Sequence, residues 1–155
     1  MKITPTHTAI NGISTFQSGT PLPLTDAVNL TNSFGGGSRP NSTGQSAQLS
    51  GAAQSRLNGW FNKAAFTVPP AFTFGNLART VPDVRGPGIN NFDFAVFKNF
   101  PIGEHKEIQF RWENYNFTNT PPFNPPTLEI SSGTFGRITS AGLGREMQFA
   151  LRLSF

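Results

Sequence analysis

Cysteine is absent from this 155-residue chain, and charged residues are scarce. Without cysteine, a disulfide scaffold, a thiolate zinc site and cysteine catalysis are all excluded. Charged side chains make up 13% of the residues, about half of their usual share in a soluble globular domain. Only His7 and His105 could supply an imidazole, and neither has a partner at metal-ligand spacing, so we expect no metal site and no cofactor.

Long apolar runs are also missing, and the first residues show no secretory signal. No segment is apolar over the length that a membrane-spanning helix needs, but a transmembrane strand needs only about ten alternating residues. The 16 Gly and 13 Pro disfavour long helices, and the 16 Phe and 2 Trp argue against a disordered polar tail. The composition therefore leaves one all-β domain, or part of a larger β structure.

The last ten residues alternate strictly between apolar and polar side chains, which predicts a strand over 146–155. A soluble sandwich strand gives the same alternation, but a soluble protein gains little by ending on a large aromatic at a terminus that frays. The tail resembles the C-terminal assembly signal of bacterial outer-membrane proteins. Its apolar positions are Met147, Phe149, Leu151, Leu153 and Phe155.

Residues 92–100 and 106–117 predict two strands of a hairpin around a tight turn. In the second strand, one face carries Ile108, Phe110 and Trp112, and the other carries Gln109, Arg111 and Glu113. So many polar groups would be costly inside a packed sandwich, whereas they suit a watery lumen. We therefore expect the first three residues to face lipid and the second three to face the lumen. Arg111 is expected to pair with Glu113 or with an acid on an adjacent strand.

A further strand is predicted near 8–18, and long irregular loops are predicted over 19–91 and 118–145. If Phe155 ends at the periplasmic rim, the short turn 101–105 is periplasmic and both long loops are extracellular, as in outer-membrane barrels. The predicted fold class is all-β. Residues 1–155 would form the C-terminal part of a transmembrane β-barrel, with about four antiparallel strands in an open sheet.

Several runs resemble the C-terminal end of TonB-dependent outer-membrane receptors, and especially the Oar-like members, which carry a carboxypeptidase-regulatory-like domain. The resemblance covers about residues 10–155, and the runs that carry it are Thr15–Leu22, Trp60–Phe66, Arg85–Asp93, Phe97–Phe100 and Phe135–Ala141. The resemblance implies a barrel of about 22 strands with a plug that the TonB complex drives. The plug, the TonB box and most strands are not in this sequence. It therefore implies a C-terminal fragment: a truncated gene, a partly identified gene or a pseudogene product.

As part of such a barrel, the chain would contribute to substrate uptake in the outer membrane. Its expected partners are outer-membrane lipid, the barrel-assembly machinery, an unknown ligand and, only through the missing plug, the TonB complex. Nucleic acid is not expected, because the basic residues behind the net charge of +4 are dispersed singly. The alternative is a small secreted β-sandwich that binds carbohydrate or a surface through aromatics such as Trp60, Phe61 and Trp112.

Catalysis is not expected. Ser14, Ser18 and Asp26 are present, but the sequence has no Gly-x-Ser-x-Gly elbow and no histidine in a triad setting. Glu107 and Glu113 share a strand face, yet at the rise of a strand they stand about 20 Å apart, too far for a glycosidase pair.

Overall fold

The computed structural model describes residues 7–35 and 37–155, which divide into two compact units. The sheet unit holds residues 7–17, 89–122 and 142–155, and the loop unit holds the described residues of 18–88 and 123–141. Secondary structure in both units is β, apart from two short 3-10 helices, η1 (Ala53–Arg56) and η2 (Lys63–Ala65). No helix among the described residues is long and apolar enough to cross a membrane.

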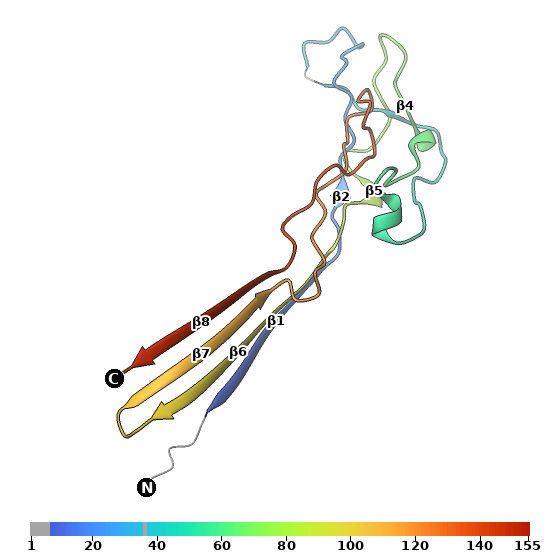
Figure 1. Ribbon diagram of the computed structural model, residues 1–155. Helices are drawn as coiled ribbons and strands as arrows, with labels where there is room; N and C mark the ends of the chain where they lie inside the picture. Colours follow the sequence, from blue (N-terminus) through green and yellow to red (C-terminus); the bar gives the residue numbers. More distant parts are fainter. Residues whose placement is uncertain (1–6, 36) are drawn as a thin grey trace. The chain divides into compact units, whose positions relative to one another are not determined.

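Four long strands form the sheet unit, in the order β1-β6-β7-β8 (Figure 1). They are β1 (Thr8–Gln17), β6 (Ile89–Ile102), β7 (Lys106–Tyr115) and β8 (Glu146–Ser154). All neighbouring strands are antiparallel, and β1 and β8 lie at the two edges without pairing to each other. The predicted fold class, an all-β antiparallel sheet that stays open, is confirmed.

The strand ends differ from those that the alternation predicts. β6 begins at Ile89 because Ile89 and Asn91 pair with Gln17 and Thr15 of β1, although the residues before 92 show no clear alternation. β7 ends at Tyr115 and not at 117, because Asn116 adopts a positive φ of 52°. A left-handed residue cannot continue a strand, and asparagine tolerates that conformation better than most residues.

The register brings both long connections to one end of the sheet. Gln17 lies opposite Ile89, and Tyr115 lies opposite Glu146. At the other end, a tight turn joins β6 to β7, and Gly103 in that turn has a φ of +75° (Figure 1). Ser154 lies opposite Glu107, so the C-terminus also lies at the end with the tight turn. Outer-membrane barrels have this arrangement of short turns and long loops.

The loop unit contains a hydrophobic core, although the sequence predicts irregular loops for these residues. Two short strand pairs frame it, β2 (Pro21–Leu22) with β5 (Val81–Arg85) and β3 (Asn41–Ser42) with β4 (Phe66–Thr67). The buried apolar side chains are Leu22, Leu24, Ala47, Trp60, Phe61, Ala65, Phe66, Leu77, Val81, Val84, Phe135 and Ile138. These residues occur singly or in adjacent pairs among Gly, Pro and Ser, so their spacing carries no period that would reveal a core.

The loop unit has a longer segment, within 18–88, and a shorter one, 123–141. Aromatic contacts and one carboxylate connect these two segments. The ring of Phe61 packs edge-on against Phe135, with ring centroids 5.2 Å apart. The carboxylate of Glu129 accepts hydrogen bonds from Thr25 Oγ1 at 3.0 Å and from the Ala27 backbone N–H at 2.8 Å. It also accepts bonds from the backbone N–H and the hydroxyl of Ser131. Glu129 therefore joins residues that lie about a hundred positions apart in the sequence.

Acid should weaken this connection. Burial raises the pKa of the Glu129 carboxyl, but the hydrogen bonds from Ala27, Ser131 and Thr25 outweigh burial, so the pKa lies below its ordinary value of 4.5. A carboxyl with a lowered folded-state pKa stabilises the fold above its unfolded-state pKa, and this stability is lost as the pH falls through the folded-state value. We expect Glu129→Gln to destabilise the loop unit at neutral pH and to reduce the further loss of stability below pH 4.5.

Denaturant unfolding followed by tryptophan fluorescence, at neutral pH and at a pH below the ordinary glutamate pKa, measures this difference. Glu104→Gln is the matched control, because Glu104 is an exposed residue of the β6–β7 turn. Equal acid sensitivity of wild type and Glu129→Gln would contradict the proposed role of this carboxylate.

Candidate functional site: the two faces of the sheet

One face of the sheet is apolar across neighbouring strands. Between β7 and β8, Ile108 lies opposite Leu153, Phe110 opposite Leu151, and Trp112 opposite Phe149. The indole of Trp112 and the ring of Phe149 are nearly parallel, with centroids 6.3 Å apart and an interplanar angle of 4°. Because side chains alternate along a strand, the register places all six residues on the same face.

The same face continues onto the other two strands. Val96 of β6 lies opposite Trp112, and Ile10 of β1 lies opposite Val96. Many of these side chains are open to the surroundings: Phe149 is 65% and Leu151 is 75% exposed. Soluble monomers rarely leave a contiguous apolar surface of this kind uncovered. The face is therefore suited to an apolar environment, although its assignment to lipid stays a prediction.

A few polar groups interrupt the apolar face. Lys98 lies opposite Phe110, and its ammonium donates a hydrogen bond to Thr8 Oγ1 at 2.8 Å. Towards the end with the long connections, the indole Nε1 of Trp112 and Oδ1 of Asn114 are buried and have no hydrogen-bond partner among the described residues. Tryptophan N–H groups commonly find partners where one end of the ring is apolar and the other is wet.

The opposite face carries the predicted lumen-facing residues. Arg111 Nη2 contacts Glu113 Oε1 at 2.9 Å, so the expected pairing of these two residues is present. The guanidinium of Arg111 also lies over the ring of Phe97, 4.8 Å from its centroid. Gln109 Nε2 donates to Asn99 Oδ1 at 3.0 Å. The polar groups of this face thus bind one another, and whether water wets them stays a prediction.

An acidic residue organises the end of the sheet where β7 stops, and sequence reasoning missed it. Asp93 Oδ1 accepts hydrogen bonds from Asn91 Nδ2 and from the backbone N–H of Asn116, both at 2.9 Å. Asn116 Oδ1 in turn accepts from the Thr120 backbone N–H. The sequence signal for the end of β7 was the pair of asparagines at 116 and 119. Asparagine tolerates the left-handed conformation, and both Asn116 and Asn119 have positive φ values in this turn.

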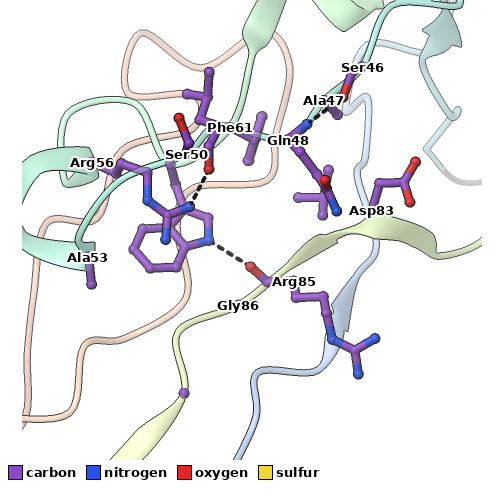
Figure 2. A pocket seen from close by; sticks show the side chains of 14 residues that line it. Ser46, Ala47, Gln48, Ser50, Ala53, Arg56, Phe61, Asp83, Arg85 and Gly86 are labelled. Atoms are coloured by element: carbon purple, nitrogen blue, oxygen red, sulfur yellow. Dashed lines mark hydrogen bonds between the residues drawn. The ribbon is translucent and has the colours of Figure 1, made fainter.

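The loop unit contains a cavity of about 620 Å³, shown in Figure 2. Its wall includes Trp60 and Phe61, which are only 5% and 2% exposed. The guanidinium of Arg56 lies over the Trp60 ring, 4.4 Å from its centroid. These aromatics are core residues and are not available to stack on a sugar, as the alternative of a carbohydrate-binding sandwich requires. The sheet unit is also a single open sheet and not a sandwich.

The two histidines and the acidic residues do not converge. Within residues 7–35 and 37–155, no group of three His, Asp or Glu side chains is placed to hold a metal ion.

Comparison with known proteins identifies the family. The model of the outer membrane beta barrel domain family matches residues 9–148, a range that includes nearly all of β1, all of β6 and β7, the loop unit and the start of β8. No curated protein and no solved structure matches the chain. The family match agrees with the two-faced sheet, the tight turn at one end and the long connections at the other. The chain therefore belongs to the outer membrane β-barrel domain family, and it is located in the bacterial outer membrane.

Proposed function

We propose that the chain is the C-terminal barrel segment of a TonB-dependent receptor of the Oar-like type, which contributes to substrate uptake as part of a complete barrel. The observation that carries the barrel role is the register, which separates a mostly apolar from a mostly polar face over β6, β7 and β8. In this proposal the apolar face contacts outer-membrane lipid, and Gln109, Arg111 and Glu113 face the lumen.

The receptor type rests on the resemblance of particular runs, two of which lie together in the structure. The Gly86 backbone N–H donates to the Thr20 carbonyl at 2.9 Å, and Arg85 Nε donates to the Gly19 carbonyl at the same distance. A Cβ atom added to Gly19 would collide with the Gly86 carbonyl, so the backbones approach as closely as glycine alone permits. The runs Thr15–Leu22 and Arg85–Asp93 thus lie side by side as antiparallel segments whose backbones approach closely at Gly19 and Gly86.

In the complete receptor, the long loops would bind the ligand, and the plug would connect the barrel to the TonB complex. The segment itself would supply strands, loops and the tail recognised by the barrel-assembly machinery. The proposal includes no catalytic role, no cofactor and no nucleic acid.

The test of the receptor type is to isolate the outer-membrane assembly that contains this chain and to cross-link it in cells. We expect the assembly to hold a plug that cross-links to the TonB protein, and we expect ligand uptake to stop when TonB is deleted. A barrel without a plug would overturn the TonB-dependent role while leaving the chain an outer-membrane barrel protein.

The assignment of faces can be tested on two adjacent residues of β8. An arginine that faces lipid near the middle of the bilayer costs about 2–4 kcal/mol, whereas one that faces the lumen costs little. In a chimaera that supplies the remaining barrel strands, we expect Phe149→Arg to reduce the amount of folded protein in the outer-membrane fraction. Gln148→Arg is the control, because Gln148 lies opposite Glu113 and an arginine there meets an opposite charge. Similar losses in both variants would refute the assignment.

A substitution of the terminal phenylalanine can test assembly in cells separately from the stability of the fold. Phe155 follows the last paired residue, Ser154, and is 93% exposed, so its side chain contributes little to packing within the described residues. We expect Phe155→Asp in the same chimaera to lower assembly in cells, whereas refolding in detergent should proceed as for wild type. Phe34→Asp, at another exposed phenylalanine, serves as the control. Normal assembly of Phe155→Asp in cells would mean that the tail is not an assembly signal.

A further inference from the structure

We propose that the apolar face of the sheet binds anionic phospholipid headgroups at the end with the tight turn, through Lys98 and Lys106. This deepens the proposed function, because it names the class of lipid that the face would contact, and it rests on the assignment of that face to lipid. The two lysines would recognise the headgroup, whereas the surrounding apolar side chains would contact the acyl chains.

The charged residues of the four long strands are sorted between the two faces of the sheet. Within these strands, as the structure describes them, every carboxylate lies at a register position of the polar face. These acidic residues are Asp93, Glu107, Glu113 and Glu146. The charged residues that the same strands place on the apolar face are two cations, Lys98 and Lys106. This face therefore combines apolar side chains with positive charge alone, which complements an anionic lipid surface.

Both lysines lie in the half of the apolar face that is nearer to the tight turn (Figure 1). Lys106 is the first residue of β7 and lies opposite Ile102, the last residue of β6. Lys98 precedes Ile102 on β6 by four residues, which is about 13 Å along a strand. In the proposed orientation this end is periplasmic, so the headgroups would belong to the inner leaflet of the outer membrane.

Lys98 is a cation with mostly apolar neighbours. Phe110 lies opposite it on β7, and Val96 and Phe100 occupy the adjacent positions of the same face on β6. Its ammonium donates a hydrogen bond to Thr8 Oγ1 at 2.8 Å, but a hydroxyl does not neutralise its charge. No carboxylate among the described residues forms an ion pair with Lys98. A charged side chain that faces lipid is costly unless it reaches the interface or an opposite charge.

The contact with Thr8 places the ammonium where a headgroup can reach it. Thr8 is the first residue of β1, so the ammonium lies at the beginning of that strand although Lys98 is inside β6. An ammonium has three donors, and Thr8 uses one of them, which leaves two for phosphate oxygens. A zwitterionic headgroup neutralises its own phosphate with an amine, whereas phosphatidylglycerol keeps a net negative charge. We therefore expect a preference for the anionic lipid.

The test measures lipid contact at Trp112, which shares the apolar face with Lys98 and lies opposite Val96. It uses the chimaera that supplies the remaining barrel strands, with the tryptophans of those strands replaced by phenylalanine. Trp60 is 5% exposed in the core of the loop unit and gives a constant background. The protein is reconstituted in phosphatidylcholine vesicles that contain brominated phosphatidylcholine or brominated phosphatidylglycerol. The bromines of either lipid quench tryptophan fluorescence on contact.

We expect brominated phosphatidylglycerol to quench the wild type more strongly than brominated phosphatidylcholine. Lys98→Met should lower the relative binding constant of the anionic lipid about fivefold. It should leave the amount of folded protein and the quenching by brominated phosphatidylcholine unchanged, because methionine suits an apolar face. Lys98→Arg should retain the preference. Lys63→Met is the matched control, because Lys63 is an exposed lysine of η2 in the loop unit.

Three outcomes would overturn the inference while leaving the lipid contact itself in place. The first is equal quenching of the wild type by the two lipids, which would mean that the ammonium has another partner, such as a carboxylate on a strand next to β1. The second is a preference that Lys98→Met leaves unchanged. The third is a preference that inorganic phosphate abolishes, which would indicate a site for soluble anions.

The same measurement separates this inference from the proposed function. If neither brominated lipid quenches Trp112, the apolar face does not contact lipid, and the assignment of faces is refuted together with the headgroup site. If both lipids quench it equally, only the headgroup site is refuted. None of these results bears on the cross-link to TonB, which tests the receptor type.

Discussion

The pairing register of the four long strands is the constraint on which the other features of the sheet unit depend. Side chains alternate with a period of two, so a slip of one residue would move every apolar side chain of a strand to the polar face. The stack of Trp112 on Phe149 joins β7 to β8 on the apolar face, and the hydrogen bond from Gln109 to Asn99 joins β7 to β6 on the reverse face. Both faces of the sheet therefore depend on the same alignment of strands.

Much of the sheet could be predicted from the sequence, because its information is local. Residues 146–155 alternate with Ala150 as the one apolar residue on the polar face, and the alternation in 107–113 is regular. The true start of β6 at Ile89 was not predictable in this way, because it depends on pairing with Gln17 and not on any pattern in β6 itself. Likewise, the end of β7 is determined by Asn116 and its bond to Asp93, a contact across the hairpin.

The loop unit shows where sequence reasoning fails. Trp60 and Phe61 look like exposed loop aromatics in a stretch rich in Gly, Pro and Ser, yet they lie at the centre of a core. Their partners come from distant segments: Phe135 packs on Phe61, and the Arg85 carbonyl accepts from Trp60. Such contacts leave no periodic signal, so neither this core nor the cavity beside it could be found from spacing alone. The family resemblance identified the runs that meet there, but not how they pack.

The two edges of the sheet constrain the order of events during biogenesis. β1 and β8 each have one hydrogen-bonded neighbour among the described strands, so each presents a row of unpaired N–H and C=O groups. Hydrocarbon contains no water to satisfy such groups, and an unpaired strand edge is a template for other strands. Additional strands must therefore pair with both edges for the sheet to be stable in hydrocarbon. Until both edges are paired, the same exposed backbone groups leave the chain open to aggregation with other copies of itself.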